Sequence, residues 1–172
     1  MISKTALTGA AGEHYVLSEL LRRGYIATLA PQGAPNMDVV VADTDGRNFC
    51  AIQVKTRQNS GRDGGWHMSA KHEKIIEERL FYAFVDFGCS PTDSTEVYLV
   101  PSAKVAEVIS AAHAAWLDNP GKGGRKRKDG PMRRFTPDYA SAFGPKPNPY
   151  PTGWLEPYRR AWWQLENSEE SH

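Results

Sequence analysis

The sequence predicts one α/β domain, because segments with helical and strand periodicity alternate along roughly the first two thirds of the chain. An amphipathic helix is expected over about residues 8–23, and two β-branched runs on either side of Asp45-Gly46 are typical of a β-hairpin. The order continues as helix, two strands and helix to about residue 118. A chain of 172 residues is long enough for one domain with a core and too short for two full ones.

The first predicted helix ends at Gly24, a typical C-terminal cap, and carries one carboxylate in an unusual place. Its apolar stripe contains Ala6, Ala10, Val16, Leu17, Leu20 and Leu21. Glu13 lies in the middle of this stripe. The opposite, solvated face is expected to carry Tyr15, Ser18, Glu19, Arg22 and Arg23. A buried Glu13 must be paired, protonated or bound to a cation; alternatively, its head reaches water near the start of the helix, where the helix dipole favours it.

The predicted hairpin places three polar side chains among apolar neighbours. Side chains alternate between the faces of a strand, so each polar residue has identifiable neighbours on its own face. These are Val40 and Ala42 for Asp38, and Phe49 and Ala51 for both Gln53 and Lys55. Because both faces of both strands are otherwise largely apolar, we expect central strands that are covered on each side. A carboxylate, an amide and an ammonium in such strands require a specific explanation.

The other elements are predicted from turn residues and periodicity. Pro31 to Pro35 form a loop before Asp38, and the glycine-rich residues 56–65 form a loop beside the hairpin. We expect strands at 25–30, 80–87 and 96–100, a short extended piece at 66–69, a helix over 70–79, and a helix from a Ser102 cap to about Leu117. The apolar face of this last helix should contain Val105, Val108, Ile109, Ala112 and Trp116.

The composition changes after residue 118, which predicts three parts: a core of residues 1–118, a loop of residues 119–134 and an extension of residues 135–172. The loop, called the basic segment below, has seven basic residues, one acidic residue and four glycines. It is either a solvated linker or an arm that contacts phosphates through Arg125, Lys126, Arg127 and Lys128. Irregular coil is expected over 135–153. A docked helix is expected over 154–166, with Trp154, Tyr158, Ala161, Trp162 and Leu165 in the core.

Bulk properties exclude several classes of protein. The net charge of +1 and the 40% hydrophobic content give no general attraction to nucleic acid or membranes. No apolar run approaches the roughly 20 residues that a membrane span requires, and the first residues lack a signal-peptide core. We therefore expect a cytoplasmic protein with no membrane association. Cys50 and Cys89 are expected to be reduced, and a zinc site that combines them with His67 and His72 lacks the usual ligand spacing.

Glu13 on the first helix, Asp38 on the second strand and Gln53-Val54-Lys55 on the third together resemble the PD-(D/E)XK nuclease superfamily. This superfamily includes restriction endonucleases and archaeal Holliday-junction resolvases. The resemblance covers residues 5 to 118 approximately and implies a restriction-endonuclease-like mixed β-sheet core flanked by helices, here followed by an irregular and helical extension. Two residues depart from the pattern. Pro35 stands three residues before Asp38, and Gln53 replaces the usual acidic residue, as in some active members such as the end-cleaving subunit of a bacterial transposase.

The resemblance implies a metal-dependent DNA endonuclease of defence, mobile-element or junction-resolving type. Such an enzyme uses Mg²⁺ or Mn²⁺ to activate water and to offset charge on the phosphate. The implied metal ligands are Asp38, Gln53, the Val54 carbonyl and Glu13, while Lys55 orients the attacking water. The implied DNA contacts are Lys71, His72, Arg125, Lys126, Arg127 and Lys128. Because duplex cutting usually needs two active sites, a homodimer is compatible with this interpretation.

Two other functions remain open. The first is a non-catalytic DNA- or protein-binding module on the same fold, in which Gln53 marks a degenerate metal site. The second is a small-molecule enzyme on an unrelated α/β fold. It is disfavoured because the sequence contains no glycine-rich phosphate loop and no GxSxG motif.

Overall fold

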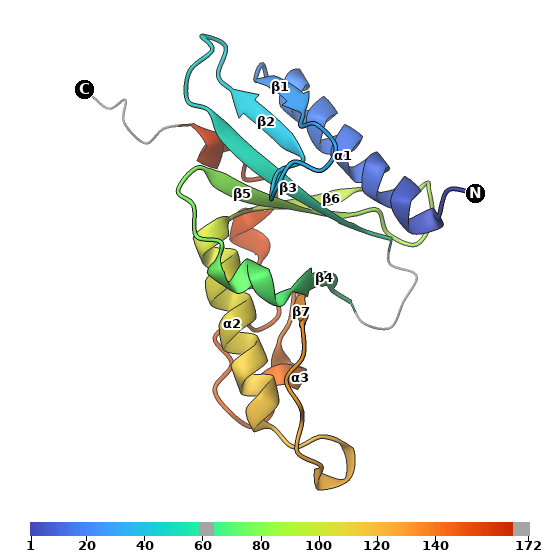
Figure 1. Cartoon of the computed structure of the whole chain (residues 1–172), viewed down its shortest axis with the longest axis vertical. Helices are drawn as coiled ribbons and strands as arrows, with labels where there is room; N and C mark the ends of the chain where they lie inside the picture. The colour runs from blue at the N-terminus through green and yellow to red at the C-terminus, as the bar shows by residue number, and fades with distance from the viewer. Residues whose placement is uncertain (59–63, 167–172) are drawn as a thin grey trace.

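A five-stranded mixed sheet forms the centre of the computed structural model, which describes residues 1–58 and 64–166 (Figure 1). Its strands, in spatial order, are β1 (Ile26–Leu29), β2 (Val39–Ala42), β3 (Cys50–Arg57), β5 (Leu80–Asp86) and β6 (Glu96–Pro101). β3 and β5 are parallel, and the other neighbouring strands are antiparallel. The mixed sheet flanked by helices confirms the predicted fold class. Residues 59–63 of the expected glycine-rich loop lie outside the described residues.

Helix α1 (Lys4–Arg22) packs against one face of the sheet through Val16 and Leu20. It begins earlier than predicted because the Ser3 hydroxyl caps it and accepts a hydrogen bond from the Ala6 N–H (3.1 Å). It ends as predicted at Gly24, whose φ of +88° is the left-handed conformation that glycine adopts without strain.

The buried stripe of α1 is rotated relative to the prediction. Leu21 was expected in the core and is 52% exposed, whereas Glu19 was expected in solvent and is only 6% exposed. The carboxylate of Glu19 is paired with Arg22 (3.1 Å) and Arg23 (2.8 Å), which compensates its burial.

Helix α2 (Ser102–Asp118) packs on the other face of the sheet, over β5 and β6. Its buried residues include the predicted Val105, Val108, Ile109 and Ala112. Two details of the prediction are wrong. Trp116 is 36% exposed, and Pro101 rather than Ser102 is the N-cap. The hydroxyl of Ser102 instead donates to the Glu77 carbonyl (2.7 Å) and accepts from the Glu77 N–H (2.8 Å), joining α2 to the chain that precedes β5.

A second, two-stranded sheet joins the core to the C-terminal extension. β4 (Trp66–Ser69) pairs with β7 (Met132–Phe135), which begins inside the basic segment and was not predicted. After β4, the chain forms only a short 3₁₀ helix, η1 (Ala70–Lys74), where a longer helix over 70–79 was expected. The boundary predicted at residue 118 is therefore crossed by a β-ladder.

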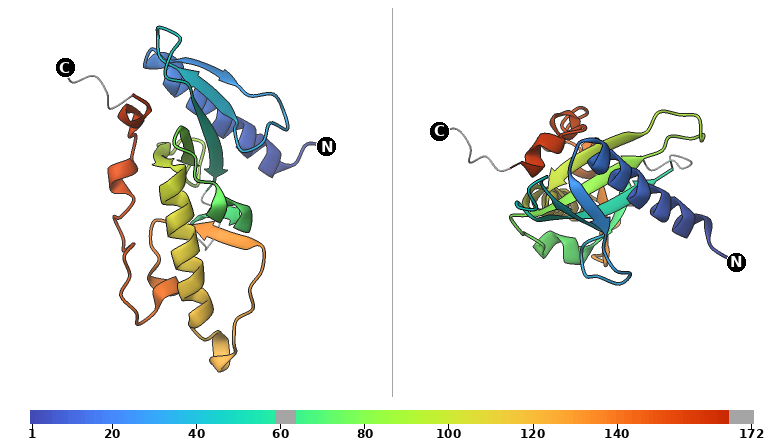
Figure 2. Two further views of the ribbon diagram at one scale, coloured as in Figure 1. Left: turned by 60° about the vertical axis from the view of Figure 1, so that its left-hand side comes forward. Right: turned by 90° about the horizontal axis from the view of Figure 1, so that it is seen from above.

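The C-terminal extension packs on the core without the long helix expected over 154–166. It contains α3 (Ala140–Phe143) and the 3₁₀ helices η3 (Glu156–Tyr158) and η4 (Trp162–Leu165), and the basic segment contains η2 (Lys122–Gly124). Arg160 separates η3 from η4 because its φ of +49° is incompatible with a continuous right-handed helix. Its N–H donates to the Val97 carbonyl (2.9 Å), so this segment lies beside the edge strand β6 (Figure 2). Trp162 is buried, as predicted.

The two cysteines are free, as predicted; Cys50 is buried and Cys89 is exposed. Within the described ranges, none of the helices combines the length and the apolar character that crossing a bilayer requires.

Candidate active site

The hairpin of β2 and β3 brings Asp38 and Gln53 together, because Val39 pairs with Ile52 and the residues beside them are therefore opposite one another. One carboxylate oxygen of Asp38, Oδ2, accepts hydrogen bonds from the Gln53 amide and from the Val54 N–H (2.7 Å). Asp38 thus directly precedes β2, at the position where the ladder between β2 and β3 would otherwise continue. Lys55 lies one pleat further along the same face as Gln53.

The face that carries these polar groups is half-open. Ile52 and Val54 point into the core beneath α1, whereas Gln53 and Lys55 are partly exposed and Phe49 is 65% exposed. This corrects the prediction that β2 and β3 are covered on both faces. The physical reason is the position of α2, which packs over β5, β6 and η1 and leaves this part of the sheet uncovered.

The main-chain carbonyl of Val54 faces the same end of β2 as the Asp38 carboxylate. Alternate residues of a strand direct their N–H and C=O groups to the same side. The Ile52 carbonyl accepts from the Asp38 N–H (2.9 Å), and the Val54 N–H donates to the Asp38 side chain, so both residues point toward β2. The ladder with β2 ends at Val39. The carbonyl oxygen of Val54 therefore lies beyond the last paired residue, beside Asp38.

Glu13 approaches this cluster from α1 through a close contact between the helix and β3. A Cβ atom on Gly12 would lie 1.8 Å from the Thr56 hydroxyl oxygen, so only glycine permits this packing distance. Glu13, the next residue, is half-buried. Burial raises the pKa of its carboxyl group, and the negative charge of Asp38 raises that pKa further. The structure thus places the Glu13 carboxyl group near enough to Asp38 for the Asp38 charge to disfavour the ionised form of Glu13.

The Lys55 ammonium and the His72 imidazole both lie in a partly desolvated environment, which lowers their pKa values. Burial lowers the pKa of Lys55, the charge of Lys71 lowers it further, and Asp38 opposes both effects. His72 is 3% exposed, and its Nδ1 lies 2.7 Å from the Tyr82 hydroxyl. Burial and the charges of Lys55 and Lys71 lower the pKa of His72 to about 4. His72 is therefore neutral near pH 7 and buried, which contradicts the expectation that it contacts DNA directly.

Lys71 lies at the rim of the site. It is exposed, and its Nζ is 3.3 Å from Oδ1 of Asn36, in the loop that leads to Asp38. Tyr82, which the sequence did not single out, is opposite Gln53 in the parallel ladder between β3 and β5. A hydroxyl in the otherwise apolar run of residues 80–85 was the available signal for a polar partner on this face.

Before it enters β7, the basic segment lies at the end of α2 that is farther from the five-stranded sheet (Figure 1). Arg127 is half-buried, because its Nη1 donates to the Trp116 carbonyl (2.9 Å) and its guanidinium lies 4.6 Å from the centre of the Trp116 ring. Asp129 is 2.7 Å from His113 Nε2. Arg125 and Lys126 before these anchors and Lys128 between them remain exposed. These three residues therefore lie on a loop that is anchored to α2, and they do not contribute to the Asp38 cluster.

Carboxylate, amide and main-chain carbonyl oxygens are ligands that suit a hard cation, and Asp38, Gln53 and Val54 carry them, although in this structure the Gln53 amide turns its nitrogen toward Asp38. In residues 1–58 and 64–166, no three His, Cys, Asp or Glu side chains form a group that could hold a metal ion. A cation at Asp38 would therefore depend on the amide of Gln53 and the carbonyl of Val54 as well as on carboxylates. Mg²⁺ accepts such a set, since it is commonly held by one or two carboxylates, with water and phosphate as the other ligands.

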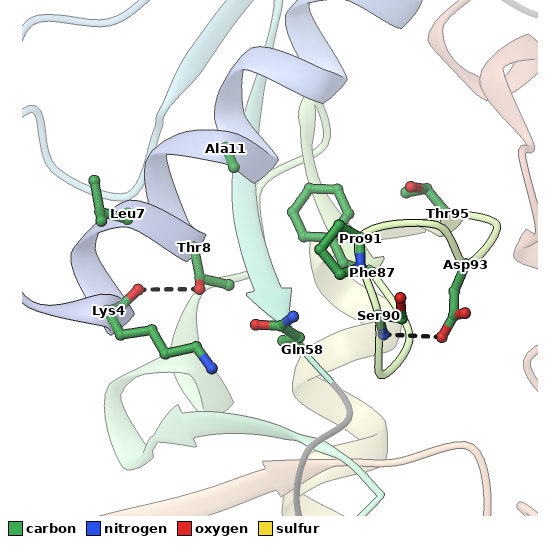
Figure 3. Close-up of a pocket in the computed structure, with 10 residues that line it drawn as sticks. All are labelled: Lys4, Leu7, Thr8, Ala11, Gln58, Phe87, Ser90, Pro91, Asp93 and Thr95. Carbon is green, nitrogen blue, oxygen red and sulfur yellow. Dashed lines mark hydrogen bonds between the residues drawn. The ribbon is translucent and has the colours of Figure 1, made fainter.

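A separate pocket lies between the first turns of α1 and the turn that joins β5 to β6 (Figure 3). Its residues are Lys4, Leu7, Thr8, Ala11, Gln58, Phe87, Ser90, Pro91, Asp93 and Thr95. Its carboxylate, Asp93, accepts hydrogen bonds from the N–H groups of Cys89 (2.8 Å) and Ser90 (3.0 Å). That carboxylate stabilises the turn, and the pocket includes none of the predicted site residues.

The chain matches no protein-family profile and no curated protein. Among solved structures, it is similar to I-Ssp6803I, a bacterial homing endonuclease, with a TM-score of 0.50 and 14% identity, over 96% of this chain and 92% of that chain. It also matches Hjc, a Holliday junction resolvase from Archaeoglobus fulgidus, with a TM-score of 0.42 and 16% identity, over 78% of this chain and 86% of that chain. The likeness to the homing endonuclease concerns the fold.

Proposed function

We propose that this protein is a metal-dependent endonuclease that hydrolyses phosphodiester bonds in DNA. The observation that carries the proposal is the placement of Asp38, which lies at the open end of β2 beside Gln53, with Lys55 one pleat away on a half-exposed face. The similarity of the fold to that of a homing endonuclease supports it.

Mg²⁺ or Mn²⁺ would be held by Asp38, the Gln53 amide oxygen, the Val54 carbonyl and Glu13. When bound, the cation supplies positive charge to the phosphate and lowers the pKa of water. The fit to these residues rests on the charge balance of the site. Asp38 raises the pKa of Glu13, so two carboxylates repel one another there and a shared cation would relieve that repulsion.

Lys55 supplies the remaining charge. Its partly buried ammonium has a lowered pKa, which brings it closer to the range in which it can exchange a proton near neutral pH. In the proposed reaction, it orients the attacking water and stabilises negative charge on a phosphate oxygen. Cutting of both strands of a duplex would use two copies of the chain.

A second candidate is a non-catalytic DNA-binding module on the same fold. It is favoured by one observation: Oδ2 of Asp38 already accepts two hydrogen bonds, from Gln53 and from the Val54 N–H. In this alternative, Asp38 only satisfies the main chain at the end of β2. The amide at residue 53 then records the loss of a metal ligand.

Cleavage of plasmid, linear duplex, single-stranded and four-way-junction DNA, with Mg²⁺, Mn²⁺ or a chelator, separates the two functions. The nuclease requires metal-dependent cutting by the wild type and its loss in Asp38→Asn. The matched control is Asp45→Asn, which removes the same charge from the exposed turn of the hairpin. Absence of cutting, together with absence of metal binding in calorimetry, would support the binding module.

The variant Gln53→Glu sharpens this test. If the site is active, the added carboxylate should strengthen metal binding and leave cutting metal-dependent. If the site is degenerate, Gln53→Glu should bind metal where the wild type does not. Metal affinity that is unchanged by this substitution would remove residue 53 from the ligand set.

A further inference from the structure

The second sheet has one buried face and one exposed face. Trp66, Met68, Arg133 and Phe135 are buried. The ladder pairs His67 with Arg134 and Ser69 with Met132 on the other face. His67 and Arg134 are exposed, and Met132 is 57% exposed. A twisted ribbon of two antiparallel strands thus presents an imidazole, a guanidinium and a thioether to solvent.

The buried face holds this ribbon rigidly on the core. The Phe135 ring stacks on Phe84 with 3.8 Å between ring centres, and Trp66 Nε1 donates to the Val85 carbonyl (2.9 Å). Arg133 is 6% exposed and paired with Glu73 of η1. The ribbon and η1 are therefore joined by a buried ion pair, and η1 carries Lys71 at the rim of the candidate active site.

The dimensions and chemistry of the ribbon suit the major groove of DNA. Two paired strands lie about 4.8 Å apart, and the major groove, about 12 Å wide, admits a two-stranded ribbon. A guanidinium can donate two hydrogen bonds to the N7 and O6 atoms of guanine, which is the commonest specific contact to a base. Apolar groups such as a thioether can contact the methyl group of thymine.

Exposed basic groups lie at one end of the ribbon, where Ser69 at the end of β4 is opposite Met132 at the start of β7. Lys71 follows β4 after one residue, and Arg125, Lys126 and Lys128 of the basic segment precede β7. Figure 2 shows the loop before β2, η1 and β7 along one side of the molecule, with the basic segment continuing toward the far end of α2. Contacts from this end of the ribbon to phosphates beside the groove would position the ribbon but carry no sequence information.

We propose that the ribbon of β4 and β7 reads base edges in the major groove, with Arg134 as the principal specificity residue and His67 and Met132 beside it. This inference rests on the proposed function in that DNA is the ligand, and it names the element that selects the site. The exposed residues Arg125, Lys126 and Lys128 contact the sugar-phosphate backbone.

Selection from duplex DNA with a randomised core tests the proposal, with Asp38→Asn as the common background so that bound DNA is not cut. We expect this protein to enrich a sequence motif. Adding Arg134→Ala should reduce discrimination at one or two adjacent positions by about 10- to 100-fold. Arg134→Lys keeps the charge but loses the planar fork, so it should lose the same discrimination while the salt dependence of binding is retained. A retained fold is checked by thermal melting.

Two matched variants complete the experiment. Lys126→Ala should weaken binding to all sequences alike and flatten the salt dependence. Arg47→Ala, which removes an exposed arginine from the hairpin turn, should leave the motif unchanged.

The proposal that the ribbon determines sequence specificity is refuted if the enriched motif is unchanged in both Arg134→Ala and His67→Ala, or if the selection enriches no motif. Neither result depends on catalysis. If the motif is lost in Arg134→Ala but the wild type never cuts DNA, the role of the ribbon is supported and the nuclease activity is refuted. If the wild type cuts DNA with metal but no motif is enriched, the nuclease activity is supported and the role of the ribbon is refuted.

Discussion

Strand β3 carries two basic side chains on one face, two residues apart, and their charges are compensated differently. Arg57 pairs with Asp86, with Nη2 to Oδ2 at 2.5 Å, and its guanidinium lies 4.1 Å from the centre of a Trp66 ring. Lys55 has no ion pair with any residue in the described ranges, and burial lowers its pKa. The Arg57 charge, which is paired within the protein, stabilises the fold. The Lys55 charge, which has no ion pair in the described residues, is available to interact with a substrate.

The largest effect is expected from Lys55→Met, which removes the ammonium group that has no ion pair in the described residues. If Lys55 acts on water or phosphate, the rate of DNA cleavage should fall by about 10²- to 10⁴-fold. Stability should be unchanged or higher, because a partly buried ammonium is replaced by an apolar chain of similar length. Initial rates and thermal melting measure the two effects. A variant with the wild-type rate would show that Lys55 has no catalytic role.

The compensated charge should respond in the opposite way. Asp86→Ala leaves Arg57 largely buried without its carboxylate and should lower the free energy of unfolding by about 3 kcal/mol, measured by urea denaturation. The double variant Arg57→Met/Asp86→Leu should recover most of this loss, since replacing both members of a buried pair is often neutral. If Asp86→Ala were no more harmful than Asp45→Ala in the exposed turn, the pair would not stabilise the fold.

A third experiment changes the contact that brings α1 to the site. Gly12→Ala places a Cβ atom against Thr56 and should destabilise the protein by about 1–3 kcal/mol, with a loss of cleavage because Glu13 moves with the helix. Gly9→Ala is the matched control. A Cβ there meets no atom within 4 Å, so the substitution should stabilise the protein by about 0.5–1 kcal/mol. Equal effects at the two glycines would exclude a special role for the contact.

The smallest effect concerns the charge of Glu13. The pKa of the Glu13 carboxyl group is raised in the folded protein. The favourable contribution of this group to the free energy of unfolding is therefore fully present below the ordinary pKa of 4.5 and is lost as the pH rises through the raised pKa. Glu13→Gln should therefore be more stable than the wild type at pH 7, by less than about 1 kcal/mol, and equally stable at pH 3.

Added Mg²⁺ should reverse the order at pH 7, because only the wild type retains the carboxylate. Thermal melting at both pH values, with and without Mg²⁺, measures these differences. A variant that is less stable than the wild type at pH 7 without metal would contradict the proposed repulsion between Glu13 and Asp38.

The features that local rules determine were predictable from the sequence. Gly24 ends α1 because the left-handed conformation after a helix favours glycine, and the Asp45-Gly46 turn sets the hairpin that brings Asp38 opposite Gln53. The alternation of strand faces placed Lys55 beside Gln53. These predictions depend on backbone geometry over a few residues.

The errors arose where distant contacts override local preference. The stripe of α1 is rotated because Gly12 packs against Thr56, which buries Glu19 and exposes Leu21. Arg160 adopts a positive φ where its N–H reaches β6, so the expected helix is broken. The pairing of β4 with β7 joins segments about 65 residues apart, and nothing in either segment alone identifies its partner.

The ladder between β4 and β7 also determines when the protein can finish folding. β7 is synthesised long after β4, so a nascent chain that ends at α2 contains Trp66 and Phe84 but lacks Phe135. In the folded protein, Phe135 stacks on Phe84 and packs beside Trp66. Such long-range pairing must wait for loop closure and is intrinsically slow. The ion pair between Glu73 and Arg133 is likewise completed only after β7 has emerged. The rim of the candidate active site therefore matures late in synthesis, after the sheet that carries Asp38.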